Sequence, residues 1–263
     1  MGRARLVIAA IIALVAIISY FGSTSENPIT GEKQRVALSP EQEVALGYKS
    51  APQMAAQMGG ISQNEKARAV VRQVGEKLAT QSIAAKSPYK FSFNVLADAR
   101  TVNAFALPGG PIFITEGLLR QLRTEGELAG VLGHEIGHVI ARHSSERLAK
   151  QQLTQGLLGA LVVGSGDYTT AQIGQVVGSM INMSYGRDDE LESDALGIRI
   201  MAEGGYDPRA LIRVMEVLAK ASGGGSRQPE FFSTHPAPEN RSARIKAEIN
   251  KRFPNGVPEG LRK

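Results

Sequence analysis

The sequence predicts an α+β fold that is mainly α-helical and carries one small antiparallel sheet. Most of the chain repeats apolar residues at the helical period, and several of these segments begin at a helix-capping residue. Only residues 91–115 alternate apolar and polar residues in the way that strands do. With 263 residues, 43% of them hydrophobic, the chain can bury one substantial core.

The first 25 residues form an apolar N-terminal segment. Arg3 and Arg5 precede a run without charge from Leu6 to Ser25, centred on LVIAAIIALVAII. A bilayer-crossing helix needs about 20 apolar residues, whereas the apolar region of a signal peptide is usually shorter. We therefore expect residues 1–25 to be a membrane anchor. A cleaved export signal is the first alternative, and a buried core helix is the second.

The arginines before this segment predict its orientation. The positive-inside rule keeps such an N-terminus in the cytoplasm and places the remainder of the chain outside it. We therefore expect a cell-envelope protein anchored in the inner membrane. The folded domain would lie in the periplasm or elsewhere outside the cytoplasm, or be exported if the segment is cleaved.

A polar, turn-rich linker is expected at residues 26–36, followed by one folded domain at residues 37–263. Ser39 can cap a helix that has Pro40 at its first position. A second helix is expected at about residues 63–79. The domain therefore begins with two helices.

The segment that follows changes to the strand period and then returns to the helical one. Residues 91–96 alternate, and residues 102–115 form two strands that turn at a Pro-Gly-Gly sequence. Thr124 and Glu127 form a capping box, which opens a long helix that continues to about Gln151. The sheet therefore lies directly before this helix in the sequence.

The remaining segments are predicted to be helical. Residues 153–183 are apolar and rich in glycine, and they predict a packed hairpin of two helices that turns at residues 164–167. A hairpin that touches the membrane or acts as a lid is the alternative. Further helices are expected at residues 186–204 and 207–220, then a flexible Gly/Ser loop, and a last amphipathic helix near residues 238–251.

Composition excludes several classes of function. Lys plus Arg total 30 and Asp plus Glu total 25, so the net charge of +5 is modest and no basic run forms a nucleic-acid patch. We expect no nucleic-acid partner. The absence of cysteine excludes disulfides and thiolate metal ligands. The sequence predicts no particular oligomeric state.

The pattern HExxH at residues 134–138 is the strongest chemical signal. His134 and His138 are four residues apart, so on a helix both rings project from one face, with Glu135 beside them. Such an arrangement can hold a zinc ion and use the carboxylate to take a proton from water. Gly133 and Gly137 each weaken the helix by about 1 kcal/mol relative to Ala, which predicts that another element approaches closely.

The third ligand is sought among the other polar residues. On a continuous helix His143 points away from the metal face, and we expect it at the helix surface. Glu190 and Asp194 are four residues apart on one face of the helix predicted at residues 186–204. One of them can bind zinc, and the other can accept the second ring N–H of a ligand histidine.

At these residues the chain resembles the zinc-peptidase family that includes HtpX, BepA and the CAAX prenyl endopeptidases. In that family HExxH is followed by a helix with the pattern ExxxD, which Glu190-Leu-Glu-Ser-Asp194 fits. The segments NPITG, NAFALPGG, GYDP and THPAPENR also match, over roughly residues 27–250. Gly186 and Ser193 stand where the family more often has serine and alanine.

The resemblance implies a zincin-type metallopeptidase domain with the small sheet beside the HExxH helix. It implies one Zn²⁺ per chain with three protein ligands, His134, His138 and Glu190. Glu135 would be the general base, and Asp194 would accept a hydrogen bond from a ligand histidine, most simply His134.

His235 is a candidate for the same site through its place in THPAPENR. A loop histidine before proline is by default a turn residue, but the family pattern implies an active-site role. It would either stabilise the oxyanion of the tetrahedral intermediate or occupy the open zinc position in a resting enzyme.

The resemblance also gives the strand pair a role. In metallopeptidases of this kind an edge strand pairs with the extended backbone of a polypeptide substrate. Residues 103–107, or the partner strand 111–115, would be that edge. A purely structural hairpin is the alternative.

Together these features predict a zinc-dependent endopeptidase that cleaves misfolded or partly unfolded cell-envelope proteins. The alternative is a non-catalytic zinc-containing chaperone or binding module in which His235 closes the metal site. A multi-span prenyl-peptide protease is disfavoured, because only one segment has the length and composition of a membrane span.

Overall fold

The computed structural model describes residues 2–165, 185–222, 230–236 and 240–263. It separates into two compact units, of which the first comprises residues 1–39 and 142–183 and the second residues 40–141 and 184–263. The expected boundaries of anchor, linker and folded domain remain predictions. The expected turn at residues 164–167 and the second helix of the apolar hairpin lie largely outside the described residues.

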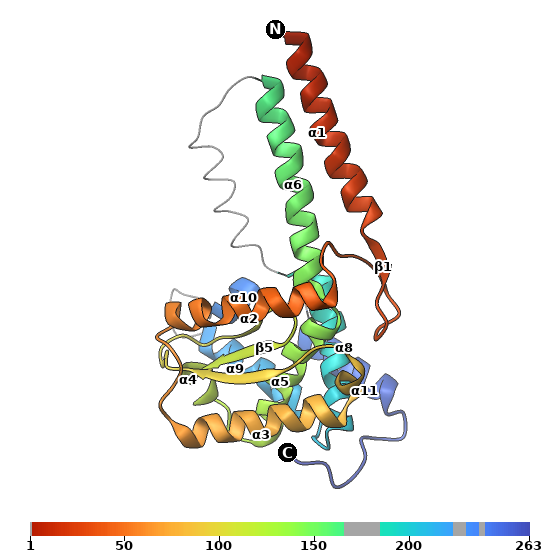
Figure 1. The fold of residues 1–263 in the computed structure, drawn as a ribbon. Helices are drawn as coiled ribbons and strands as arrows, with labels where there is room; N and C mark the ends of the chain where they lie inside the picture. The colour runs from red at the N-terminus through yellow and green to blue at the C-terminus, as the bar shows by residue number, and fades with distance from the viewer. Residues whose placement is uncertain (1, 166–184, 223–229, 237–239) are drawn as a thin grey trace. The chain divides into compact units, whose positions relative to one another are not determined.

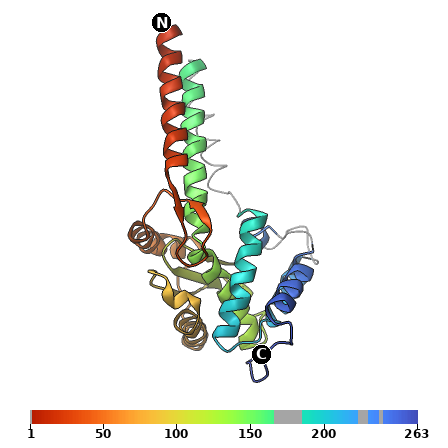
Figure 2. The same ribbon diagram turned by 90° about the vertical axis from the view of Figure 1, so that its right-hand side faces the viewer.

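In the first unit, two long helices lie side by side (Figures 1 and 2). A short antiparallel hairpin replaces part of the expected linker, with Thr24 opposite Arg35. The described elements of this unit are α1 (Gly2–Gly22), β1 (Thr24–Glu26), β2 (Lys33–Arg35) and α6 (His143–Ser165).

The second unit places its helices around a small sheet (Figure 1). The first helices described in this unit are α2 (Pro40–Gln57), α3 (Glu65–Gln81), the 3₁₀ helix η1 (Ile83–Lys86), α4 (Glu116–Leu119) and α5 (Glu125–Ile140). The later helices are α8 (Arg187–Glu203), α9 (Ala210–Ser222), α10 (Glu230–Thr234) and α11 (Arg241–Arg252). The α+β class and the mainly helical content are therefore confirmed.

The sheet of the second unit has three described strands in the order β3-β5-β4. Strands β4 (Ala104–Ala106) and β5 (Pro111–Thr115) form the expected antiparallel hairpin. Strand β3 (Ser92–Leu96) pairs with β5 in parallel, so the sheet is mixed and not wholly antiparallel. The sequence could not reveal this, because a strand has the same alternation whichever way its neighbour runs.

Strand β5 is central, because it is hydrogen-bonded to β3 on one side and to β4 on the other. The prediction that residues 111–115 are a substrate-binding edge is therefore wrong. Strand β4 is an edge of this sheet among the strands that the structure describes, so only the alternative at residues 103–107 remains.

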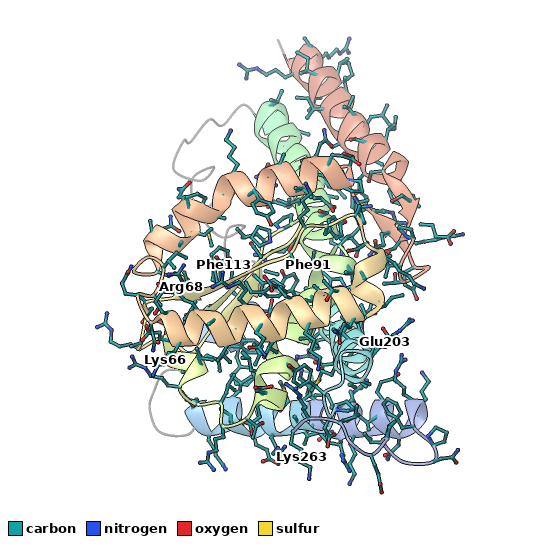
Figure 3. All side chains as sticks on the ribbon, turned by 60° about the horizontal axis from the view of Figure 1, so that its bottom comes forward. Lys66, Arg68, Phe91, Phe113, Glu203 and Lys263 are labelled. Carbon is teal, nitrogen blue, oxygen red and sulfur yellow. The ribbon has the colours of Figure 1, made fainter. Side chains whose placement is uncertain are left out.

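Helix α5 forms the centre of the second unit. Thr124 caps it as predicted, by accepting a hydrogen bond from the backbone N–H of Glu127, whereas the Glu127 side chain accepts one from the backbone N–H of Arg123. Every residue from Gly126 to Ile140 is buried, because α3, α8, α9 and the sheet all contact this helix. Figure 3 shows Phe113 of β5 inside this unit and Lys66 at its margin.

The long helix expected from Thr124 to about Gln151 is broken, and this prediction is wrong. Helix α5 ends at Ile140, and α6 begins at His143. Between them Arg142 adopts a positive φ of 61°, a left-handed conformation that costs an L-residue about 1–2 kcal/mol. The Arg142 guanidinium donates a hydrogen bond of 2.7 Å to the Leu38 carbonyl oxygen, which helps to fix the break.

Helices α5 and α8 cross closely, and the tightest contact is at Gly137. A Cβ atom added to Gly137 would lie 2.7 Å from Ser193 Oγ and 2.9 Å from Ser193 O. The Ser193 hydroxyl also donates a hydrogen bond of 2.5 Å to the His134 carbonyl oxygen. A Cβ atom added to Gly133 would lie 3.4 Å from its nearest neighbour, the carbonyl oxygen of Gly197 on α8, so α8 also approaches Gly133 but comes closest at Gly137.

We expect Gly137→Ala to lower the free energy of unfolding by about 1–3 kcal/mol, because the added methyl group overpacks the helix crossing. Thermal unfolding of both variants measures the effect. Gly133→Ala is the matched control, since the same change on the same helix meets no clash and gains up to about 1 kcal/mol of helix propensity. If both variants lowered the free energy of unfolding equally, α5 and α8 would not be closest at Gly137.

Candidate metal centre

The metal centre lies within the second unit and is built from two crossing helices and one short segment. Helix α5 carries His134, Glu135 and His138, and all three side chains are buried. Residues four apart on a helix share a face, so both rings point the same way. A fully apolar surface of α5 would have packed equally well, and burial of three polar side chains therefore indicates a site.

Helix α8 supplies the two predicted carboxylates. Its N-terminal turn contains the exposed Asp188, which suits the positive end of the helix dipole. Glu190 and Asp194 are instead 0% and 3% exposed. The close crossing at Gly137 brings the buried face of α8 against the histidines of α5.

Four side chains direct a metal-ligating atom at one point. The ligand atoms of His134, His138, Glu190 and His235 all lie within 4.8 Å of one another. His134 Nε2 is 3.0 Å from His138 Nε2 and 3.4 Å from Glu190 Oε2. His138 Nε2 is 3.4 Å from Glu190 Oε1. His235 Nδ1 is 3.5 Å from His134 Nε2.

These distances fit a zinc ion. Bonds of about 2.0–2.2 Å in a tetrahedral site place neighbouring ligand atoms about 3.3–3.6 Å apart. Imidazole nitrogens with a carboxylate are also a ligand set that zinc accepts. The centre therefore has the spacing and the chemistry of a zinc site.

The carboxylates of the centre favour positive charge on His134. Burial acts to lower the pKa of His134, but hydrogen bonds to Asp194 and Glu190 outweigh it and raise the pKa to about 9. A metal ion binds the neutral ring and displaces this proton. Burial acts to raise the pKa of Glu190, but His235, His134 and His138 outweigh it and hold this pKa well below its ordinary value.

Asp194 lies behind the ligands, where it contacts the second nitrogen of a histidine. Its Oδ1 is 3.0 Å from His134 Nδ1, the ring nitrogen that faces away from the other ligand atoms. Such a contact fixes the orientation of the ring and leaves Nε2 for the metal. The structure thus places Asp194 beside His134, the histidine that the resemblance implied.

Arg241 is a member of the centre that the sequence reasoning missed. Its guanidinium donates two hydrogen bonds of 2.8 Å to the two oxygens of Asp194. Arg241 Nη1 lies 3.0 Å from Glu190 Oε2. The two groups form an ion pair, but their geometry is not that of a hydrogen bond. Burial alone would lower the pKa of Arg241 and raise that of Asp194, but their mutual attraction, together with the neighbouring charged groups of the centre, outweighs burial in both.

One signal could have identified Arg241 from the sequence. It is the last residue of THPAPENR, a segment from which only His235 was selected. An arginine in the first turn of an amphipathic helix is by default solvated, and nothing local distinguishes this one. In the structure it is 4% exposed.

Aromatic rings hold the imidazoles in place. The Phe231 ring stacks on His235 with centroids 4.4 Å apart, and the Tyr185 ring stacks on His138 at 4.1 Å. His235 is 0% exposed, its Nδ1 is 2.9 Å from Glu190 Oε1, and its Nε2 is 3.5 Å from Glu135 Oε1. His235 therefore lies inside the centre and not in a surface turn.

Glu135 has an unusual environment. It is 0% exposed, and neither of its carboxylate oxygens has a hydrogen-bond partner among the described residues. Burial raises its pKa, although His235 and His134 oppose the shift. A buried carboxylate without hydrogen bonds is costly for the fold, which indicates a chemical role.

His143 does not belong to the four-residue group. The expectation that it lies on the helix surface is wrong, however, because its side chain is 1% exposed. The break at Arg142 removes the continuous helix on which that expectation depended.

The HExxH helix, the crossing helix with a buried carboxylate and the adjacent edge strand together define a zinc-metallopeptidase domain. The chain belongs to peptidase family M48, whose profile matches residues 65–249. The expected family and the zinc cofactor are thereby confirmed.

Curated relatives support the same assignment. The chain is 30% identical over 237 residues to the beta-barrel assembly-enhancing protease of Yersinia pestis, covering 87% of this chain and 48% of that protein. It is 31% identical over 193 residues to the protein of that name from Escherichia coli (strain K12), covering 70% and 39%. Mitochondrial metalloendopeptidase OMA1 of Arabidopsis thaliana is 35% identical over 152 residues, covering 57% and 30%. The chain thus spans half or less of the length of these relatives.

Proposed function

We propose that this chain is a zinc-dependent endopeptidase that hydrolyses peptide bonds in misfolded or partly unfolded proteins of the cell envelope. The observation that carries the proposal is the buried carboxylate of Glu135. It has no hydrogen-bond partner among the described residues and lies beside four convergent metal-ligating side chains. A structural zinc site has no need of such a group.

Three residues are proposed as the protein ligands, namely His134, His138 and Glu190. Zinc, when bound, supplies Lewis-acid chemistry and lowers the pKa of water from 15.7 to about 7. Glu135 takes a proton from the attacking water and passes it to the departing amine. Burial raises the pKa of Glu135, and a more basic carboxylate accepts a proton more readily.

Asp194 and Arg241 are proposed to position the ligands. Asp194 holds the Nδ1 side of His134, so that Nε2 stays directed at the metal. Arg241 holds both oxygens of Asp194 and is also paired with Glu190. One guanidinium thereby fixes two carboxylates that lie four residues apart on α8.

The substrate is proposed to bind in an extended form along strand β4. Residues 104–106 form an edge of the described sheet, and β4 lies alongside α5. An extended peptide can add to such an edge through main-chain hydrogen bonds, with little dependence on sequence. This mode suits unfolded polypeptide, whose backbone groups are available for pairing.

An envelope location is proposed from the N-terminal helix. Arg3–Gly22 of α1 is long and apolar enough to cross a membrane. With the basic N-terminus in the cytoplasm, the catalytic unit would lie in the periplasm. The names of two relatives refer to β-barrel assembly, which agrees with substrates in the envelope.

Metal removal tests this function on the purified full chain. We expect the wild type to contain one zinc per chain and to cleave casein, an unfolded substrate. A chelator should abolish cleavage, and added zinc should restore it. Cleavage that survives complete removal of the metal would overturn the proposed chemistry.

A second candidate is a non-catalytic zinc module in which His235 is a permanent fourth ligand. This candidate is favoured by the position of His235 Nδ1 within the group of ligand atoms.

The His235→Ala variant separates this module from an enzyme in which His235 occupies the metal only at rest. In such an enzyme, the variant should cleave casein on the order of tenfold faster, because removing an internal ligand that binds with about 1.4 kcal/mol opens the metal to substrate. Ser233→Ala, on the same segment and exposed, is the control. Inactivity of both the wild type and His235→Ala would favour the binding module.

A further inference from the structure

The two helices of the first unit meet along a seam of mainly small residues. On α1 every residue from Arg3 to Gly22 is exposed except one stripe, formed by Ala9, Ile12, Ala13, Ala16 and Tyr20. On α6 the matching positions recur at alternating spacings of four and three residues, at Ala149, Leu153, Gly156, Ala160 and Val163. This is the spacing of a helix pair that stays in register over several turns.

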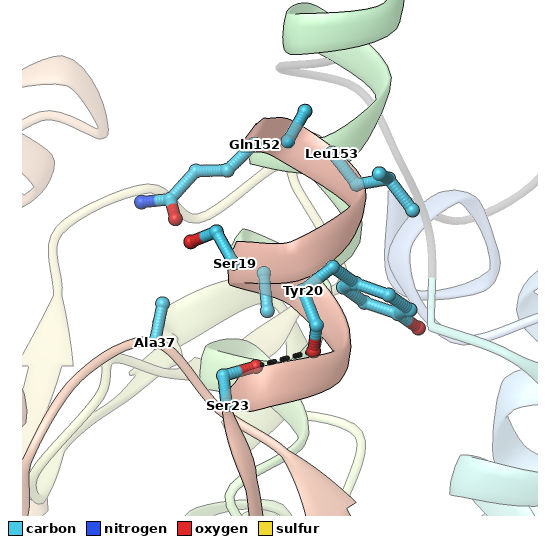
Figure 4. Close-up of a pocket in the computed structure, with 8 residues that line it drawn as sticks. Ser19, Tyr20, Ser23, Ala37, Gln152 and Leu153 are labelled. Atoms are coloured by element: carbon cyan, nitrogen blue, oxygen red, sulfur yellow. Dashed lines mark hydrogen bonds between the residues drawn. The ribbon is translucent and has the colours of Figure 1, made fainter. Parts of the chain in front are cut away.

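The backbones approach closely at this seam. A Cβ atom added to Gly156 would lie 2.5 Å from the Cβ atom of Ala16. Where α1 ends, a small cavity of about 60 Å³ separates the helices, lined by Ser19 and Tyr20 on one side and by Gln152 and Leu153 on the other (Figure 4). Beyond this cavity α6 continues along α1 for the rest of its described length.

Large apolar side chains point away from the seam. Nine residues of α1 are between 39% and 61% exposed: Leu6, Val7, Ile8, Ile11, Leu14, Val15, Ile17, Ile18 and Phe21. Leu161 of α6 is 68% exposed. A pair of helices in water places large apolar residues inside, whereas a pair in lipid places small residues at the contact and large ones outside.

The charges of α6 show where its apolar part begins. Lys150 is its last charged residue, and residues 151–165 carry none. Polar side chains persist to Gln155, and residues 156–163 are Gly, Ala, Leu and Val only. At 1.5 Å per residue this apolar part rises about 10 Å beside α1.

The end of α1 has side chains that are typical of a membrane surface. The guanidinium of Arg35 lies 5.3 Å from the ring centroid of Tyr20 and 5.0 Å from that of Phe21. Aromatic rings beside a cationic group are typical of the interface between lipid and water. Tyr20 and Leu153 line the same cavity, so α6 reaches this level at about Leu153.

We infer that α6 enters the lipid bilayer from about Leu153 onward and lies in the acyl-chain region beside α1. This inference rests on the proposed membrane anchor. Its occupant is lipid and not a second protein copy, because the exposed apolar residues surround α1 on every side except the seam with α6. The chain then contacts the membrane twice, and the second contact falls between His138 and Glu190 in the sequence.

Cysteine labelling tests the inference, because the chain contains no native cysteine. The full chain is placed in phospholipid nanodiscs, which leave both faces of the bilayer open to a polar maleimide. Leu161→Cys and Ile11→Cys should escape labelling until detergent is added, whereas the exposed Lys66→Cys should be labelled throughout. Labelling of Ile11→Cys before detergent would overturn the anchor itself. Protection of Ile11→Cys with labelling of Leu161→Cys would overturn only the inference about α6.

A fluorescence experiment then distinguishes whether lipid or protein surrounds the side chain at residue 161. The chain contains no tryptophan, so Leu161→Trp gives a single signal. Lipids brominated on the acyl chain should quench Leu161→Trp strongly and the control Lys150→Trp weakly. A Leu161→Trp signal that acyl-chain bromine does not quench would overturn the inference, even if Leu161→Cys is protected from labelling.

Discussion

Replacing Glu135 by glutamine is expected to reduce casein cleavage by a factor of about 10²–10⁴, the range that general acid–base catalysis contributes. The amide has the size of the carboxylate but cannot take a proton from water. His134, His138 and Glu190 are unchanged, so zinc should remain bound. Cleavage rate and zinc content are measured on the same preparation.

The stability of this variant is a second part of the prediction. Glu135 is buried and its carboxylate lacks hydrogen-bond partners among the described residues. Since burial opposes its charged form, the neutral amide should leave the melting temperature unchanged or raise it.

Glu125→Gln is the matched control for Glu135→Gln. It makes the same change on the same helix, at an exposed side chain paired with Arg262 at 3.2 Å. This variant should cleave casein at the wild-type rate. Wild-type cleavage by Glu135→Gln would contradict the proposed role of Glu135, and equal loss in both variants would indicate an effect on α5 as a whole.

Replacing Arg241 by glutamine is expected to lower the free energy of unfolding by about 3–5 kcal/mol, the cost of breaking a buried ion pair. Without the guanidinium, Asp194 and Glu190 would lose their arginine partner and keep only the histidines around them as counter-charge. Zinc supplies positive charge at the same place, so the loss should be smaller in the zinc-loaded protein than after chelation. Unfolding measured with and without zinc gives both values.

Arg209→Gln is the control for Arg241→Gln, because Arg209 also pairs with an aspartate, Asp207, but its side chain is 57% exposed. The Asp207 side chain is only 4% exposed, but water reaches the arginine and screens the pair, so the loss should be smaller than for Arg241→Gln. If Arg241→Gln does not fold, Arg241→Lys keeps the charge without the paired hydrogen bonds and should lose less stability. Similar small losses from Arg241→Gln and Arg209→Gln would show that Arg241 does not neutralise the centre.

Local sequence signals predicted the helices that carry the proposed metal ligands. The capping box at Thr124 and the spacing of His134 and His138 determine the start of α5 and the face that its ligands share. The same reasoning placed Glu190 and Asp194 together on α8. These features depend on residues within one or two helical turns, and the helical period is sufficient to read them.

Features that depend on distant residues were not predictable in this way. The break at Arg142 uses a conformation that arginine rarely adopts, held in part by a hydrogen bond to the distant Leu38. The parallel pairing of β3 with β5 depends on how the chain crosses between strands. Arg241 was overlooked because its partners on α8 lie 47 and 51 residues before it in the sequence.

The sequence distance of Arg241 also determines when the centre can be completed. It follows His134 by 107 residues, so a chain made from its N-terminus presents both HExxH histidines well before this cation exists. Until α11 has been synthesised and has packed against α8, two carboxylates of the centre lack their arginine partner. A nascent chain therefore has no completed metal centre until its last helix is in place.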